Sequence, residues 1–307
     1  MAEIPSYRGL NCREDRMRSA TGALESRTRV LDLSVGLVED LRSEVRRQEK
    51  GPEGFCQDFQ VCLPYRGLFV WHVGGEDVVG DSNQVVFVRS GEPYRMSGPL
   101  RDGYAELIIT PDRQVLSEVA HVNGQPLSYH PLFTRRTRRA TPGLQSFRTR
   151  FLHWATTASR RDNFEAEELV IALLQTAFQR NGSLDQPNAA TTARLIRRAK
   201  EFLEAQLSDR ILLADVARVV GTSPAYLTHL FTRVEGVSLH QYLTQLRLAR
   251  ALVELPHADD LTRLALEVGF SSHSHLSYVF RRTFGCTPSQ FRETARRAAP
   301  PSPLRDQ

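Results

Sequence analysis

Cysteine and histidine are the side chains here that most often hold metals or attack substrates, and their spacing favours neither chemistry. The four cysteines are Cys12, Cys56, Cys62 and Cys286. They form no CxxC pair and no Cys/His cluster with zinc spacing. In the middle of the chain, His72, His121 and His130 are isolated and form no HxH motif. We therefore expect reduced thiols, no metal, no cofactor, no catalytic residues and no enzymatic activity.

A second group of residues recurs along the C-terminal third of the chain. Two matches are spaced by 48 residues: Val216-Ala217 with Leu264-Ala265, and Gly221 with Gly269. Four more are spaced by 49: Leu227 with Leu276, Phe231 with Phe280, Gly236 with Gly285, and Tyr242 with Phe291. The second copy therefore has one extra residue just after its turn.

Each copy has the pattern of a helix-turn-helix unit. A short helix carries a small alanine that lets a second helix cross closely, and a glycine in the turn can adopt positive φ. Ser223 and Ser271 are candidate N-caps, and Pro224 occupies a first helical position. The second helix presents Leu and Phe to a core and a polar face to solvent. The units are predicted at about 213–235 and 261–284, joined by a helix over 239–255 that spans about 25 Å.

The net charge of the chain is concentrated in the same segment. Residues 191–300 contain 15 Arg or Lys and 10 Asp or Glu, whereas residues 1–190 contain equal numbers of each sign. A basic excess confined to one segment is the electrostatic footprint of a nucleic-acid partner.

The remaining sequence predicts three further regions. Residues 1–54 are interpreted as an N-terminal extension, with helical spacing of Leu31, Val35, Val38 and Val45 within 28–50. Residues 55–140 contain short apolar runs divided by Gly, Pro and Asp, typical of strands in a sandwich or small barrel. Residues 141–182 predict helices over 144–157 and 164–180, and 181–190 predict a polar linker. The apolar stripe of the second helix, centred on Leu173, predicts a dimer surface.

The C-terminal third resembles the AraC/XylS family of bacterial transcription regulators. The resemblance covers residues 190–297, and its most specific part is the GFSS…F…FG.TP..FR pattern near the end. The segment LPYRGLFVWHVGGEDVVGDSNQVVFVRSGEPYRMSGP is similar to the family's cupin-like sensor domain. The resemblance implies an α+β chain with a cupin-like β-barrel and helices at 55–140 and 141–182, followed by an all-α DNA-binding domain.

The family's roles place DNA contacts on the exposed parts of the two second helices. For the first unit these residues are Ser223, Ala225, Tyr226, Thr228, His229 and Arg233. For the second unit they are His273, Ser274, His275, Ser277, Tyr278, Arg281 and Arg282. The arginines are better placed for phosphates than for bases. Arg247 and Arg250 match family arginines on the spacer helix, with structural and DNA-facing roles both open.

A small-molecule effector is expected inside the barrel, where aromatic and polar residues would contact it. The candidates are Tyr65, Arg66, Trp71, His72, Tyr94 and Arg95. We further expect double-stranded promoter DNA and RNA polymerase as partners, a homodimer, an activating role, a cytoplasmic location and no membrane contact. The N-terminus has no signal-peptide pattern, and no apolar run approaches the roughly 20 residues of a membrane span.

Two other classes of function remain open at this point. One is a cupin-type metalloenzyme with an accessory DNA-binding domain, for which bound iron or zinc would be the sign. The other is a DNA-architectural protein without a ligand. The sequence identifies neither the effector nor the target genes.

Overall fold

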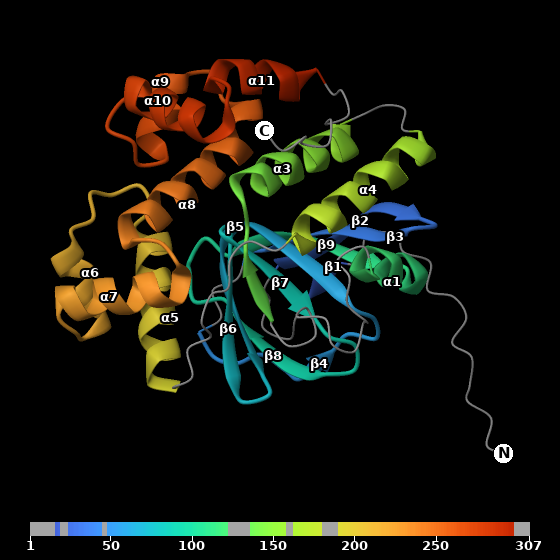
Figure 1. The fold of residues 1–307 in the computed structure, drawn as a ribbon, viewed down its shortest axis with the longest axis horizontal. Helices are drawn as coiled ribbons and strands as arrows, with labels where there is room; N and C mark the ends of the chain where they lie inside the picture. The colour runs from blue at the N-terminus through green and yellow to red at the C-terminus, as the bar shows by residue number, and fades with distance from the viewer. Residues whose placement is uncertain are drawn as a thin grey trace.

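The computed structural model describes residues 16–18, 24–44, 48–121, 136–157, 162–179 and 190–297. A sheet domain comes first and a helical domain second, and Figure 1 shows the helical domain beside the sheet. The fold class is α+β, as the sequence predicts.

The strands of the first domain form one bent antiparallel sheet. They are β1 (Arg16–Arg18), β2 (Leu24–Leu33), β3 (Gly36–Ser43), β4 (Gly54–Phe55), β5 (Gln60–Val73), β6 (Glu76–Asp81), β7 (Gln84–Val88), β8 (Pro93–Ser97), β9 (Tyr104–Pro111) and β10 (Thr137–Arg139). The main order is β1-β2-β3-β9-β5-β7-β10, while β6 and β8 pair with β5, and β4 pairs with β8. Among the described strands the sheet does not close, so the expected barrel is an open, folded-over sheet.

Strand β5 belongs to both halves of this sheet. Its first part pairs with β7 and β9, and its second part pairs with β6 and β8. The register with β9 shifts between Pro64 and Arg66, which marks a bulge that bends the strand. Gly67 follows with φ of 65°, and a Cβ there would lie 2.1 Å from the carbonyl oxygen of Gly103. The bend therefore requires glycine at this position.

The sheet domain has two apolar cores, one on each side of the sheet. The core between the two halves includes Cys62, Phe69, Trp71, Tyr104 and Ile108. The other core lies between the sheet and the helices α1 (Arg113–His121), α3 (Pro142–Thr157) and α4 (Asn163–Phe178). Figure 1 shows α3 and α4 lying across one face of the sheet. The two faces are thus available for different roles.

The N-terminal region is more structured than the sequence predicts. The helical spacing within 28–50 is wrong as an indication of a helix, because β2 and β3 form a hairpin there and β3 pairs with β9. Leu31 and Val38 reach the core on these strands, and Val35 lies in the turn between them. The sheet therefore begins before residue 55. Val45 lies outside the described residues.

The apolar stripe of α4 packs against other parts of the same domain. Its side chains are buried in the core between the sheet and the helices, and Leu173 and Phe178 have 0% exposure. The buried residues are Leu169, Val170, Leu173, Leu174 and Phe178. A surface that is already covered by its own domain is not free to bind a second copy. The prediction of a dimer surface on this stripe is therefore wrong, and these residues form part of the core of their own domain.

The second domain consists of helices and contains two small cores. Its elements are α5 (Ala190–Ala205), α6 (Leu213–Val220), α7 (Pro224–Glu235), α8 (Leu239–Glu254), the 3₁₀ turn η2 (Leu255–His257), α9 (Leu261–Glu267), α10 (His273–Phe284) and α11 (Pro288–Arg296). One core joins α5–α7 to the first half of α8, and the other joins its second half to α9–α11. Figure 1 shows α8 running between the two units.

Two further sequence expectations concern connecting and membrane segments. The linker at 181–190 lies outside the described residues, except that α5 starts at Ala190. None of the described helices has the length and apolar character needed to cross a membrane.

Candidate DNA interface and its link to the sheet domain

The first helix-turn-helix unit consists of α6 and α7. Gly221 ends α6 in the left-handed conformation, with φ of 82°. Ser223 caps α7 by accepting a hydrogen bond from the backbone N–H of Tyr226, and Pro224 follows in the first turn. Leu227 and Phe231 are buried, so the opposite face of α7 projects outward. The sequence predicts each of these local features.

The second unit consists of α9 and α10 and follows the same plan with one correction. The N-cap of α10 is Ser272, which accepts from the backbone N–H of His275, and not Ser271 as predicted. The hydroxyl of Ser271 instead lies 3.1 Å from Nδ1 of His275. The extra residue in this turn explains the error, because it moves the cap one position along the chain.

The predicted DNA contacts lie on the outward faces of α7 and α10. Of these thirteen residues, His273 and Ser277 are partly buried and the other eleven are exposed. Ser277 Oγ lies 3.2 Å from His273 Nε2, so these two side chains orient each other. Tyr226 and Tyr278 are 50% and 65% exposed, which is unusual for aromatic side chains without a partner.

The arginines on these helices differ from those on the spacer helix. In the described part of the chain, Arg233, Arg281 and Arg282 are exposed and form no ion pair, so their guanidinium groups are free for phosphates. Arg247 on α8 instead donates to the carbonyls of Leu207 and Asp209 at 2.8 and 2.7 Å. The structure thus gives Arg247 a structural role.

Both units continue into a helix that begins with the same capping box. Ser238 and Gln241 form it at the start of α8, and Thr287 and Gln290 form it at the start of α11. Each pair satisfies two backbone N–H groups that the helix itself leaves free. The repeat therefore extends beyond the two helix-turn-helix units to the helix that follows each of them.

The turn between β6 and β7 contacts the end of α7 and the start of α8 through buried hydrogen bonds. Tyr242 on α8 donates its hydroxyl to Asp81 at 2.6 Å, and its carbonyl accepts from Asn83 at 3.1 Å. Gln84 donates to the carboxylate of Glu235, at the end of α7, at 3.0 Å. All five side chains are buried. The sheet domain and the first unit therefore share a polar interface shielded from water, which we call the junction cluster.

Two cations accompany the acids of the junction cluster. Lys200 on α5 lies 2.8 Å from the Glu235 carboxylate and 5.2 Å from the ring centroid of Tyr242. Arg139 on β10 donates to the Glu235 carbonyl at 2.9 Å and lies 5.8 Å from the same ring. Burial raises the pKa of Asp81, while Lys200 and the Tyr242 hydroxyl act in the opposite direction. The cluster joins both domains through charge as well as hydrogen bonds.

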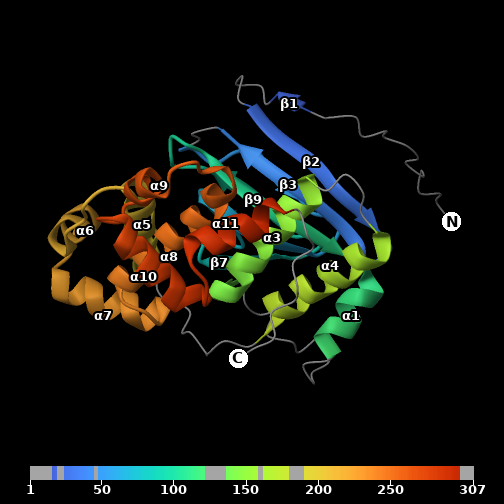
Figure 2. The same ribbon diagram turned by 90° about the horizontal axis from the view of Figure 1, so that it is seen from above.

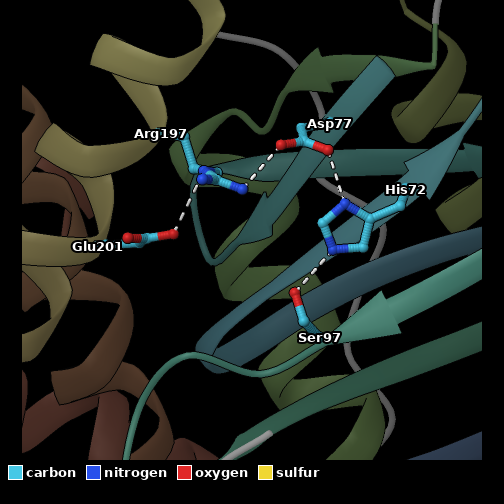
Figure 3. A network of polar contacts seen from close by, with 5 residues as sticks. All are labelled: His72, Asp77, Ser97, Arg197 and Glu201. Carbon is cyan, nitrogen blue, oxygen red and sulfur yellow. Dashed lines mark hydrogen bonds and ion pairs between the residues drawn. The ribbon is translucent and has the colours of Figure 1, made fainter. Parts of the chain in front are cut away.

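Figure 3 shows a second link between the domains, on the strands β5, β6 and β8. His72 Nδ1 lies 2.6 Å from Asp77, and its Nε2 lies 2.8 Å from the hydroxyl of Ser97. Arg197 on α5 donates to the other oxygen of Asp77 at 2.7 Å and lies 3.5 Å from Glu201. The structure thus places His72, an effector candidate, in a polar network that reaches the helical domain through Asp77 and Arg197.

The other effector candidates do not converge on one site. The rings of Trp71 and Tyr94 stack with their centroids 4.8 Å apart, at the core between the two halves of the sheet. Tyr65 donates to Asp40 at 2.6 Å. Arg66 is exposed, and Arg95 lies 3.5 Å from Glu53 near the surface. Of the six candidates, Trp71 and Tyr94 are the pair that the structure brings together.

Glu106 is a buried polar residue next to Cys62 that the sequence reasoning missed. It is 3% exposed, and its Oε2 atom contacts no hydrogen-bond partner. Burial is the main cause that raises its pKa to about 8, and the thiol of Cys62 opposes this by hydrogen bonding. The sequence signal was a single charged residue in the apolar run YAELIIT.

No group of described side chains has an arrangement that could hold a metal ion. Cys62 is buried, and burial raises its pKa well above the ordinary value for a thiol. Cys12 and His130 lie outside the described residues.

Comparison with known proteins identifies the repeated segment. Residues 216–294 match the family model of a helix-turn-helix domain. The regulatory protein PocR of Salmonella typhimurium is 33% identical over 99 residues, covering 32% of this chain and 33% of PocR. The activator RhaR of Klebsiella pneumoniae is 32% identical over 145 residues, covering 46% of this chain and 52% of RhaR. The chain thus spans about a third to a half of the length of these relatives.

One further relative and two solved structures are also similar to this chain. The thermoregulatory protein LcrF of Yersinia pestis is 26% identical over 249 residues, covering 75% of this chain and 87% of LcrF. Among solved structures, an AraC-type DNA-binding protein from Chromobacterium violaceum is 30% identical, with a TM-score of 0.33. It covers 35% of this chain and 96% of its own. ToxT from Vibrio cholerae is 10% identical, with a TM-score of 0.33, and covers 84% and 98%.

Proposed function

We propose that this chain is a sequence-specific transcription regulator of the AraC/XylS type that reads two successive major-groove segments of promoter DNA. The match of residues 216–294 to a helix-turn-helix family model and the similarity to the activator RhaR support this. The observation that carries the proposal is the pair of helix-turn-helix units at the two ends of α8, each with an exposed polar face. At 1.5 Å per residue, the 16 residues of α8 span about 24 Å. With such a spacer, the recognition helices α7 and α10 could bind two major-groove segments about 34 Å apart, which is one turn of DNA.

The two recognition faces favour a particular mode of reading. They lack asparagine and glutamine, and their arginines lie towards the C-terminal ends of α7 and α10. Histidine, serine, threonine and tyrosine make single hydrogen bonds to base edges, in contrast to the bidentate contacts of Arg, Asn and Gln. We therefore propose that DNA shape and phosphate contacts supply much of the specificity.

The proposal extends to the partners of the protein. The sheet domain would bind a small-molecule effector, and the protein would act with RNA polymerase in the cytoplasm. An activating role agrees with the name of RhaR, a transcriptional activator. Self-association as a homodimer is kept as part of the proposal, but through a surface other than the buried stripe of α4.

Binding of the full chain to promoter DNA at several salt concentrations tests the central claim. We expect log Kd to rise with log salt with a slope near 0.9 per phosphate contacted. A footprint should show two protected major-groove segments one helical turn apart. Equal affinity for the protected sequence and for a scrambled DNA of the same composition would contradict a sequence-specific regulator.

The two alternatives lead to different results in the same preparation. A metalloenzyme would retain stoichiometric iron or zinc through purification, measurable by elemental analysis. A DNA-architectural protein would show no change in thermal stability with any metabolite, since a ligand that binds the native state raises that stability.

A further inference from the structure

Arg148 on α3 is a fully buried arginine that lacks a counter-ion. It is 2% exposed, and its Nη1 donates to the carbonyl oxygen of Pro64 on β5. Its Nε and Nη2 atoms are buried and contact no hydrogen-bond acceptor. Leaving two donors of a buried cation unsatisfied is costly, so this arrangement needs a further partner.

The described residues around Arg148 do not provide that partner. The neighbouring Tyr65 favours the charged form of the guanidinium but already donates its own hydroxyl to Asp40. The second carboxylate oxygen of Asp40 accepts from Arg42 at 2.9 Å. Burial lowers the pKa of Arg148 to about 9, which still leaves the side chain positively charged at neutral pH.

The two unpaired atoms define the shape of the group that would bind them. Nε and Nη2 form one edge of the planar guanidinium, and their N–H bonds point in nearly the same direction. A carboxylate presents two oxygens that match this edge in a bidentate pair. A water molecule would accept one such bond but would leave the charge uncompensated.

The helix that carries Arg148 contacts several other parts of the molecule. Helix α3 packs on β5 of the sheet and on α8, the spacer between the two helix-turn-helix units. Figure 2 shows α3 seen from above, between the sheet strands and the helices of the second domain. A group bound to Arg148 would therefore lie between β5 and a helix that also contacts the spacer helix.

We propose that Arg148 is the anchor of a binding site for a small-molecule carboxylate, held in a bidentate pair by Nε and Nη2 at the contact between α3 and β5. The carboxylate neutralises the buried guanidinium and satisfies both free donors. That this carboxylate belongs to the effector rests on the proposed function. The site itself does not depend on DNA binding.

Thermal unfolding of the full chain with sodium acetate, compared with sodium chloride at equal ionic strength, tests the site. Acetate should raise Tm saturably by about 2–4 °C, as a native-state ligand does. Acetamide, which has the same size and no charge, should leave Tm unchanged. An equal Tm in acetate and chloride, or an equal shift with acetamide, would overturn the proposal, as would a larger shift with inorganic phosphate.

Substitutions at Arg148 and at an exposed arginine elsewhere separate this site from general salt effects. Arg148→Lys keeps the charge but loses the paired donors, so the apparent Kd for acetate should rise at least tenfold. Arg148→Met should abolish the response, whereas Arg101→Gln, at an exposed position between β8 and β9, should retain it. A full acetate response in Arg148→Lys would overturn the proposal even if the methionine variant fails to fold.

DNA binding of the same wild-type sample in chloride distinguishes the two conclusions. An acetate response together with absent DNA binding contradicts the proposed function alone. Sequence-specific DNA binding without any acetate response contradicts the carboxylate site alone.

Discussion

Glu106 has a buried carboxyl group whose surroundings disfavour the charged form. The stability of the fold should therefore depend on pH in a direction that can be predicted. The pKa of Glu106 is raised to about 8, well above the ordinary 4.5, so the folded state keeps a proton that the unfolded state releases. The contribution of Glu106 to stability is therefore greatest below pH 4.5 and falls as the pH rises towards 8, by about 1.4 kcal/mol per unit. Glu204 shares this behaviour, since its pKa is also raised to about 8, first by burial.

Glu106→Gln should remove the Glu106 share of that loss. We expect the variant to gain stability over the wild type between pH 5 and 8 and to retain the part due to Glu204. Urea unfolding across this pH range measures the difference. Glu49→Gln, at an exposed position, serves as the control and should follow the wild-type curve. A wild-type stability that does not decline over this range would contradict the assignment.

Arg281 and His273 on α10 should have different effects on DNA binding. Arg281 is exposed near the end of the helix, and His273 lies at its start, oriented by Ser277. Arg281→Ala should weaken binding to all sequences alike and reduce the salt slope by about one. His273→Ala should cost about 1–3 kcal/mol on the best site and less elsewhere. Titrations on specific and scrambled DNA check this, and identical profiles for the two variants would refute the division of roles.

At the scale of elements, α4 is a core helix and not an exposed one. Leu173→Ala should lower the free energy of unfolding by about 2–5 kcal/mol, because it removes a fully buried side chain from a shared core. The oligomeric mass should not change. Chemical unfolding and analytical ultracentrifugation give the two readouts, and Gln175→Ala, exposed on the same helix, is the matched control. A variant of normal stability and reduced mass would restore the dimer interpretation.

The sequence predicts the helices of the second domain well because their signals are local. Gly221, Ser223 and Pro224 act through hydrogen bonds and backbone angles within a few residues of themselves. The hairpin of β2 and β3 was missed for the opposite reason. Asp40 is buried there as an acceptor for Tyr65, 25 residues away in sequence, and so interrupts the alternation that identifies a strand.

The candidate sites also differ in how far the sequence predicts them. The outward faces of α7 and α10 follow from helical periodicity once their buried leucine and phenylalanine are known. Arg148 gives no such signal, because an arginine in a helix is usually exposed. Its burial depends on how α3 packs against β5, which no local pattern contains.

For the whole molecule, the junction cluster is the contact that ties the sheet domain to the first unit. Tyr242→Phe removes the donor to the buried Asp81 and leaves that carboxylate with an unmet hydrogen bond. We expect a loss of about 1–3 kcal/mol in the free energy of unfolding. Tyr226→Phe, half-exposed on α7, should cost little.

A double-mutant cycle with Asp81→Asn measures how much of that loss belongs to the contact itself. The two substitutions should be non-additive, because each removes the same hydrogen bond. Additive losses would show that Tyr242 and Asp81 stabilise their own domains independently.

The junction cluster also limits how freely this protein can exchange parts with its relatives. Its members come from both domains: Asp81, Asn83 and Gln84 from the sheet, and Glu235 and Tyr242 from the helices, with Lys200 paired to Glu235. A chimera that joins this sheet domain to another DNA-binding domain would bury Asp81 opposite an unmatched surface. In such a fusion the two domains should pack together when the incoming domain carries Glu, Lys and Tyr at the corresponding positions. Without these residues the interface between the domains should not form. In engineering terms, the boundary for grafting a new specificity onto this sheet domain lies within the outward-facing helices α7 and α10 and not at the linker.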